Sequence, residues 1–337
     1  MNALPKETIR QLRGPILRSV SRSFYLSIRL LPLKLRDPIA LAYLLARATD
    51  TIADTTAADG AIRRDELAKL AGWIQGNTTA GRVASLDSFA ALQKNEAERV
   101  LIRAVPDCLA WLNSLDRDDR SEIRDVLLTI NEGQTLDVAR FAGPLTAHGG
   151  IQTAADLDRY TYLVAGSVGE FWTRVCGRKL PGFAERGSKE MIELGTEYGK
   201  GLQLVNILRD IGADMRAGRC YLPAEELERA HASAADLARD GSGALPVFGA
   251  WLERAERNLD AGLVYSCAIR PFRLRLATAL PALIGARTLA LLQQAGAAVF
   301  ERKVKVPRAE VRAIIMNATI ALASPPALRR QFERYRK

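Results

Sequence analysis

The feature that most constrains the fold is a stripe of polar residues within an otherwise apolar stretch, residues 203–223. Its members recur every three or four positions: Gln203, Asn206, Asp210 and Asp214. On a helix of about 3.6 residues per turn, this spacing places all of them on one face. Because an isolated charge is costly to bury, the aspartates need a cation or hydrogen-bond donors. The stretch therefore predicts a helix that lines a cavity, with carboxylates that hold a hard metal ion.

A second stretch repeats the pattern more than 150 residues earlier in the chain. It carries Tyr43, Arg47, Asp50 and Asp54 at the same helical spacing. A lone Asp-x-x-x-Asp pair is typical of a solvated helix face, but two pairs, each with an arginine nearby (here Arg47 and Arg209), favour a site. If the two helices face each other, their oxygens suit Mg²⁺, which completes its shell with water and substrate phosphates.

Composition favours an all-α protein in one domain. The 337 residues are 48% hydrophobic and 6% aromatic, and runs of alternating β-branched residues are scarce. Four scattered cysteines form no Cys-x-x-Cys pair, so neither a disulfide framework nor a zinc site is indicated. The glycine- and proline-containing break at 143–150 resembles a domain boundary. Since the acidic helices lie on either side of it and are expected to meet, we predict a single domain over 1–337.

The net charge of the chain restricts the kinds of molecule that it is expected to bind. A net charge of +10 suits diphosphate substrates or anionic lipid surfaces. Nucleic acid is not expected as a partner, because the basic residues form no dense run or recognition motif. The N-terminus lacks an apolar signal core, and the most apolar stretch, 276–300, is interrupted by polar residues and reads as a buried helix. These features predict a cytoplasmic protein that can still rest on a membrane surface.

Paired aspartates beside arginines suggest that the protein handles a diphosphate through Mg²⁺, with Mn²⁺ as a substitute ion. Loss of diphosphate from an allylic carbon leaves a carbocation, which requires a water-free cavity with apolar and aromatic walls. The candidate wall residues are Phe24, Tyr43, Tyr160, Val164, Val168 and Phe171. For any single one of them, ordinary helix packing is a better explanation than contact with substrate.

Four segments resemble the motifs of the squalene/phytoene synthase family, in the family's order and at about its spacing. They are SRSFYLSIRLLP (21–32), LAYLLARATDTIADT (41–55), YTYLVAGSVGEF (160–171) and YGKGLQLVNILRDIGADMRAGRCYLP (198–223). The resemblance implies an all-α helical bundle of the isoprenoid-synthase type with a central cavity. It also implies Mg²⁺-dependent head-to-head joining of two prenyl diphosphates through a cyclopropyl diphosphate.

The resemblance also implies roles for particular residues. Asp50, Asp54, Asp210 and Asp214 match the metal-binding aspartates. Ser21, Arg22, Arg47 and Arg209 match positions that contact diphosphate, with Gln203 and Asn206 beside the metals. Tyr160 matches a tyrosine of the first half-reaction, and Tyr43 matches a second cavity tyrosine. Ala53 and Ala213 stand where the family often has a further carboxylate, so an additional ligand there is not expected.

The identity of the product depends on whether a reduction by NADPH follows the joining step. RKVKVPRAEVRAIIMNAT (302–319) resembles a late basic region of squalene synthases, and Lys303, Lys305 and Arg308 are candidates for binding NADPH phosphates. We therefore expect squalene synthesis from farnesyl diphosphate through presqualene diphosphate and NADPH reduction. Dehydrosqualene, hydroxysqualene or phytoene synthesis without reduction is the alternative. A catalytically silent binding protein of the same fold is the alternative from a different class.

Overall fold

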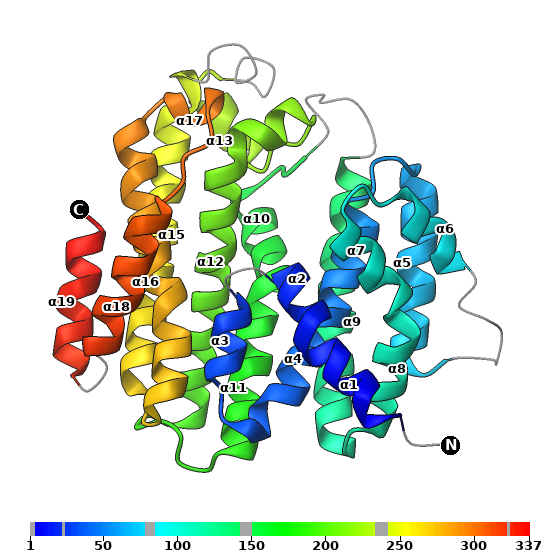
Figure 1. The fold of residues 1–337 in the computed structure, drawn as a ribbon. Helices are drawn as coiled ribbons and strands as arrows, with labels where there is room; N and C mark the ends of the chain where they lie inside the picture. Colours follow the sequence, from blue (N-terminus) through cyan, green and yellow to red (C-terminus); the bar gives the residue numbers. More distant parts are fainter. Residues whose placement is uncertain (1–3, 22–23, 78–84, 142–149, 233–241, 322–323) are drawn as a thin grey trace. The chain divides into compact units, whose positions relative to one another are not determined.

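The structure is a computed structural model that describes residues 4–21, 24–77, 85–141, 150–232, 242–321 and 324–337. Contacts divide the chain into two compact units, Met1–Ala139 and Arg140–Lys337, which are described one at a time. In the described residues every regular element is a helix, apart from one isolated bridge between Ala184 and Ile269 (Figure 1). The predicted all-α class is confirmed.

The first unit consists of helices that surround α4 (Leu33–Ala53). The others are α1 (Lys6–Gln11), a π-helical turn η1 (Leu12–Ile16), α2 (Leu17–Ser21), α3 (Phe24–Leu30), α5 (Gly60–Gln75), α6 (Ser85–Leu92), α7 (Glu96–Arg103), α8 (Val105–Ser114) and α9 (Arg117–Arg140). Helix α4 packs against α5, α7 and α8. Thirteen of its 21 residues are buried, so its polar residues project from a helix that is otherwise part of the core.

The start of α4 differs from what its prolines indicate. Pro32 and Pro38 predict a passage between helices, but only Pro32 lies outside α4, and Pro38 lies within its second turn. That position is tolerated because the carbonyl left without an N–H belongs to the exposed Lys34, where water can satisfy it. Arg36 closes the corner between α3 and α4 by donating to the carbonyl oxygens of Leu31 and Arg29, at 2.8 and 2.9 Å.

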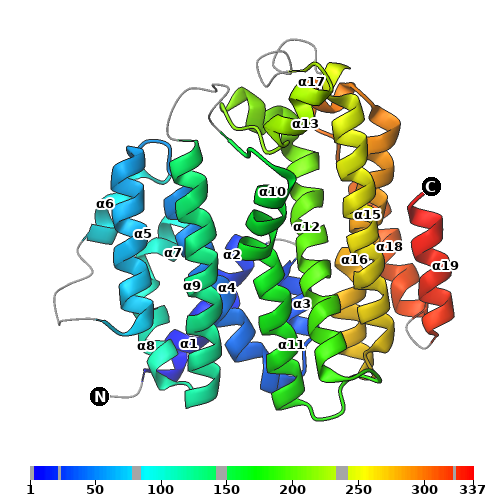
Figure 2. The ribbon, with the colours of Figure 1, turned by 180° about the vertical axis from the view of Figure 1, so that it is seen from behind.

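The second unit is built around α12 (Ser188–Arg216). Its other elements are α10 (Ala154–Thr161), a π-helical turn η2 (Tyr162–Gly166), α11 (Ser167–Lys179), α13 (Ala224–Arg229), a 3₁₀ turn η3 (Ser242–Ala244), α15 (Leu245–Ala268), α16 (Phe272–Ala295), α17 (Ala298–Glu301), α18 (Arg308–Ala321) and α19 (Pro325–Tyr335). Helix α12 packs against α11 and α15, and α16 packs against α15, α18 and α19 (Figure 2). Helices α13 and α19 were not predicted from the sequence.

Close packing of α11 on α12 depends on glycine. A Cβ atom built on Gly169 would lie 1.9 Å from the carbonyl oxygen of Gly195, far inside van der Waals contact. Only glycine at both crossing positions lets the two backbones approach this closely. The crossing fixes the axial position of α12 relative to α11. It thereby also fixes the position of the polar residues that lie two and more turns further along α12.

Helix α16 is the one described helix that is long and apolar enough to cross a membrane. Within its most apolar window, 72% of the residues are buried inside the protein. The sequence predicts a buried helix in this region, and the burial agrees with that prediction. Burial of such a helix against α15, α18 and α19 contributes to the core of the second unit.

Candidate functional site

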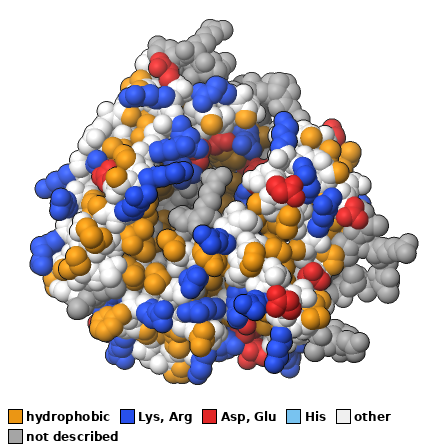
Figure 3. Space-filling view, viewed as in Figure 1, with side chains coloured by type: hydrophobic (Ala, Val, Ile, Leu, Met, Phe, Trp, Pro, Cys, Tyr) orange, Lys and Arg blue, Asp and Glu red, His pale blue; other side chains and the backbone are white. Residues whose placement is uncertain are grey.

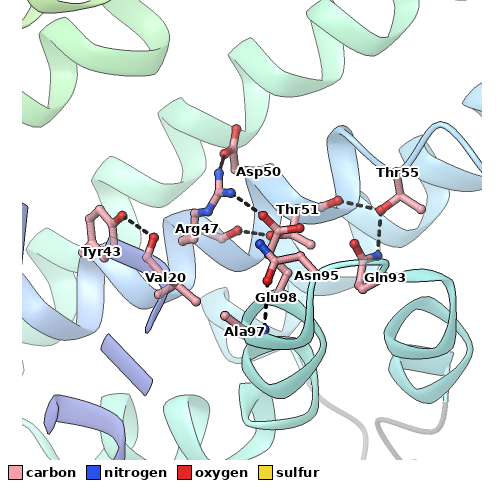
Figure 4. Close-up of polar contacts among 10 residues, drawn as sticks. All are labelled: Val20, Tyr43, Arg47, Asp50, Thr51, Thr55, Gln93, Asn95, Ala97 and Glu98. Carbon is pink, nitrogen blue, oxygen red and sulfur yellow. Dashed lines mark hydrogen bonds and ion pairs between the residues drawn. The ribbon is translucent and has the colours of Figure 1, made fainter. Parts of the chain in front are cut away.

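In the first unit, the polar residues of α4 form a charged cluster that we call the α4 cluster: Tyr43, Arg47, Asp50, Asp54 and Glu98. Arg47 lies between two carboxylates. One of its guanidinium nitrogens contacts Asp50, and the other donates to Glu98 Oε1 at 2.6 Å (Figure 4). The Tyr43 hydroxyl donates to the carbonyl oxygen of Val20 at 3.2 Å. Asp54 is the C-cap residue of α4 and is exposed.

Glu98 joins this cluster because of a local signal at the start of α7. Asn95 is the N-cap residue, and its side chain accepts a hydrogen bond from the amide of Ala97 at 3.0 Å (Figure 4). The cap begins the helix at Glu96, and α7 packs against α4. Glu98 is therefore held opposite Arg47. No motif in the sequence marks it, because its partner lies 51 residues away.

The electrostatics of Asp50 reflect crowding by protein and by other carboxylates. Although 43% of its side chain is exposed to solvent, the surrounding protein and then the Asp54 carboxylate raise the pKa of Asp50 to about 7. Arg47 opposes this shift, and Asp137 adds to it. Asp137 on α9 is thus a further carboxylate near Asp50 that the sequence analysis did not single out.

The N-terminal candidates are described only in part. Ser21 is buried, and its hydroxyl donates to the carbonyl oxygen of Leu17 at 2.5 Å. Its oxygen can still accept a hydrogen bond. Arg22 and the side chain of Phe24 lie outside the described residues. Val20, one residue before Ser21, anchors Tyr43, so the end of α2 is attached to α4.

In the second unit, the α12 cluster consists of Arg209, Asp210, Asp214, Arg219 and Lys303. Asp210 contacts two cations: Arg209 donates to its Oδ2, and the ammonium of Lys303 lies 2.7 Å from its Oδ1. Asp214 accepts a hydrogen bond from Arg219 at 2.8 Å. Gln203, which is half-buried, and Asn206, which is exposed, precede these aspartates along the same helix.

The cations of the α12 cluster decide the charge state of Asp210. Burial alone would raise its pKa, but hydrogen bonds and charges from Arg209 and Lys303 outweigh burial and lower the pKa below its ordinary value. Asp210 is therefore ionised at neutral pH. Lys303 is 93 residues away in the sequence, where it is a candidate for NADPH binding, and in the structure it contacts a candidate metal ligand.

The other basic candidates lie near Lys303 in the chain. Lys305 and Arg308 are exposed, Lys305 in the segment before α18 and Arg308 as its first residue. This segment leads from α17, which packs on α12, to the start of α18. The sequence-predicted group of three is thus divided: one member pairs with Asp210, and the other two face solvent.

Tyr160, the candidate tyrosine of α10, belongs to an aromatic group. Its ring stacks on Tyr221 with centroids 5.4 Å apart, and Tyr221 meets the edge of Phe141 at 5.1 Å. Tyr221 follows Arg219 in the loop after α12, where Gly218 has a φ of +78°. The sequence analysis placed Tyr221 inside a motif without giving it a role. The structure therefore places the candidate tyrosine beside the loop that also carries the partner of Asp214.

The backbone connects this loop to the start of α10. The amides of Ala224 and Glu225 donate to the carbonyl oxygens of Ile151 and Gln152 at 3.0 and 3.1 Å. The Glu225 carboxylate also accepts from the amide of Ala154 at 3.1 Å. These bonds join the start of α13, which follows the α12 loop, to the segment 151–154 at the start of the helix that carries Tyr160.

Val164 and Val168, the candidate wall residues, are both half-buried. Val164 lies in the π-helical turn η2, and Val168 follows it in α11. A π-helical turn takes more residues per turn than an α-helix, so the α-helical spacing from Tyr160 to Val168 does not by itself put the two on one line. The sequence predicts one uninterrupted helix over 154–177, and this prediction is wrong at the π-helical turn.

The donor set was compared with what a metal ion requires. Within the described ranges, no group of three or more His, Cys, Asp or Glu residues is close enough to hold a metal alone. Each cluster instead offers two aspartates one helical turn apart, with cations at hand. That set fits Mg²⁺, which takes few carboxylates and keeps places for water and phosphate oxygens, better than Zn²⁺, which requires a nearly complete protein cage.

Comparisons with known proteins agree on one family. A sequence model described as Squalene/phytoene synthase matches residues 17–310. A Neurospora crassa protein named probable squalene synthase is 27% identical over 90% of this chain and 60% of its own length. The presqualene diphosphate synthase of Rhodopseudomonas palustris is 31% identical over 65% of this chain and 64% of its own length. The matches thus span less than two thirds of either relative.

A solved structure of TcSQS with the ligand E5700 has a TM-score of 0.79 to this chain at 22% identity. It covers 98% of this chain and 90% of the solved one. At that identity the likeness shows the fold. The all-α fold that the motifs predict, that of the isoprenoid-synthase type, is thereby confirmed.

Proposed function

Because the chain belongs to the squalene/phytoene synthase family, we propose that it is a prenyltransferase that joins two farnesyl diphosphates head to head. The product of the first step would be presqualene diphosphate, which NADPH then reduces to squalene. The observation that carries the proposal is the α12 cluster, where ionised Asp210 lies among Arg209, Lys303 and the Arg219–Asp214 pair. Carboxylates interleaved with cations suit a metal–diphosphate ligand, in which both signs of charge need partners.

Asp50, Asp54, Asp210 and Asp214 would hold Mg²⁺, for which Mn²⁺ can substitute. When bound, the ion neutralises diphosphate oxygens and makes diphosphate a better leaving group. The pKa of Asp210 lies below its ordinary value, so its carboxylate is ionised at neutral pH. This supports the role, because a metal ligand has to be deprotonated.

The arginines and the serine would bind the diphosphates. Arg47 and Arg209 each contact an aspartate, and each has further donors that can turn to a phosphate oxygen. Ser21 retains an acceptor and can donate to phosphate once its bond to Leu17 is exchanged. Gln203 and Asn206 would orient water or phosphate beside the aspartates of α12.

Tyr160 and Tyr43 would act on the organic part of the substrate. The stacked rings of Tyr160 and Tyr221, together with Phe141, form an aromatic surface of the kind that stabilises an allylic cation. Val164 and Val168 would add apolar wall, which keeps water from quenching the cation. Tyr221 and Phe141 join the set proposed from the sequence.

NADPH would bind through Lys305 and Arg308, whose side chains are exposed and basic, together with Lys303 once the latter leaves Asp210. Charge-assisted contacts to the cofactor phosphates are the expected interaction. We place the protein in the cytoplasm, as one domain that makes peripheral contact with the inner face of the cytoplasmic membrane.

Product analysis tests the proposal. The purified protein is incubated with farnesyl diphosphate and Mg²⁺, with and without NADPH, and hydrocarbons are identified by mass spectrometry. Squalene that forms only with NADPH supports the reductive reaction. Dehydrosqualene or hydroxysqualene in both arms rejects it, and product only from geranylgeranyl diphosphate assigns phytoene synthesis.

Variants separate catalysis from mere binding. Asp50→Ala and Asp210→Ala should each abolish turnover, while circular dichroism and the midpoint of thermal unfolding stay near those of the parent. Unchanged turnover in both variants would reject the metal sites. No product from the parent with either substrate, combined with tight binding of diphosphate, would point to a catalytically silent binding protein.

A further inference from the structure

Helix α18 presents an exposed face on which basic and large apolar residues lie together. Arg308, Arg312, Met316 and Ile320 follow one another at four-residue spacing, so they share this face. Met316 is 60% exposed and Ile320 is 77% exposed, the highest value among the exposed large hydrophobic side chains. The space-filling view shows basic side chains among hydrophobic ones on the side of the molecule where α18 and α19 lie (Figure 3).

The opposite face of α18 is firmly attached to the protein. Ile314 and Ala318 are buried, and the helix packs against α16 and α19. Asn317 donates to the Tyr335 hydroxyl at 3.0 Å and accepts through its carbonyl oxygen from Gln331 at 2.7 Å. The exposed face is therefore presented by an anchored helix.

The charges on the exposed face share one sign. Arg308 and Arg312 are exposed, and the acidic residue of the first turn, Glu310, is turned toward Arg287 in an ion pair of 2.5 Å. In the described part of α18, no acidic side chain accompanies the two arginines on this face. A partner that covers it must carry negative charge and also accept two large apolar side chains.

We propose that this face of α18 docks on an anionic phospholipid bilayer, with Arg312 at the headgroups and Met316 and Ile320 in the interface. A second copy of this chain fits poorly, because the net charge is +10 and two such faces would repel. Nucleic acid would pair with the arginines but leave the apolar side chains in water. A bilayer satisfies both, as interfacial helices do.

The inference assigns a surface to the peripheral contact proposed above, and it does not depend on the reaction. Its test uses no substrate, so its failure would leave the proposed chemistry untouched. The full chain is mixed with sucrose-loaded vesicles of phosphatidylcholine alone or of phosphatidylcholine with about 30% phosphatidylglycerol, which gives the surface a negative potential. The vesicles are then sedimented. Bound and free protein are then quantified.

We expect binding to the anionic vesicles, little to the neutral ones, and release in about 0.5 M salt, since the headgroup attraction is screened. Arg312→Gln should weaken binding about fivefold, as expected for one basic residue at such a surface. Met316→Ser with Ile320→Ser should weaken it about tenfold through lost apolar burial.

The control removes two exposed apolar side chains elsewhere, each somewhat less exposed than Met316 and Ile320. Ile62 and Leu128 are 55% and 54% exposed, and their double serine variant should bind as the parent does. No binding by the parent, equal binding to both vesicle types, or equal losses in the two double variants would each overturn the proposal. So would a parent dimer in size-exclusion chromatography that the α18 variants convert to monomer.

Discussion

Lys303 provides the sharpest test of the α12 cluster. Its ammonium lies 2.7 Å from Asp210 Oδ1, so a metal ion that binds through this oxygen has to displace it. Since 49% of the Lys303 side chain is exposed, solvent screens the pair, which contributes at most about 1 kcal/mol. At about 1.4 kcal/mol per tenfold in affinity, Lys303→Gln should bind Mg²⁺ or Mn²⁺ about fivefold more tightly than the parent.

The assay is a titration of free Mn²⁺ followed by electron paramagnetic resonance, without diphosphate and at low salt. Lys305→Gln is the matched control, because it removes the same charge from the same segment without touching the Asp210 pair. Its Mn²⁺ affinity should stay within about twofold of the parent value, given how weakly exposed charges act at a distance. Asp210→Asn with Asp214→Asn should remove the high-affinity site altogether.

Adding inorganic diphosphate should reverse the effect. Lys303 can then pair with a phosphate oxygen, a contact that Lys303→Gln lacks. With diphosphate present, the parent should therefore bind Mn²⁺ more tightly than Lys303→Gln. If Lys303→Gln binds Mn²⁺ no more tightly than Lys305→Gln, then Lys303 does not compete with the metal. The role assigned to the Asp210 ion pair would then be wrong.

Three further predictions concern packing, chemistry and thiol reactivity. Gly169→Ala should lower the free energy of unfolding by about 3 kcal/mol in a urea titration, because the new methyl group meets the backbone of Gly195. The control Gly72→Ala, with no atom within 4 Å of the new Cβ, should raise the free energy of unfolding by about 0.5 kcal/mol. Equal effects of the two substitutions would contradict the packing argument. Tyr160→Phe keeps the stack on Tyr221, and turnover should fall about 100-fold. Full activity would exclude a role for the hydroxyl. All four cysteines are buried, and burial raises the pKa of each thiol. Ellman's reagent at pH 8 should therefore detect no thiol in the native protein and four after denaturation. Rapid reaction of any thiol in the native protein would refute this prediction.

Local patterns predicted what depends on local spacing. The polar stripe on α12 and the stripe on α4 follow from helical periodicity, and both helices are present with these residues along them. Helix α19 was missed although Ser324 caps it by accepting from the amide of Ala327. Pro325 and Pro326 follow that cap, and two consecutive prolines read as the end of a helix more readily than as its first turn.

Contacts between distant residues could not be predicted in the same way. Lys303 pairs with Asp210 across 93 positions, and Glu98 with Arg47 across 51. Neither pair belongs to one helix, so no periodicity in the sequence relates its members. The π-helical turn at 162–166 was missed because its residues have no distinct propensity, and packing of η2 against α12 accompanies it.

The bonds between the first residues of α13 and the start of α10 have a consequence for motion. Ala224 and Glu225 are joined to Ile151, Gln152 and Ala154 by three hydrogen bonds. A displacement of the start of α13 therefore has to break these bonds together or carry the start of α10 with it. In hydrogen exchange, the amides of 154, 224 and 225 should report one common free energy of opening, as members of one cooperatively opening unit.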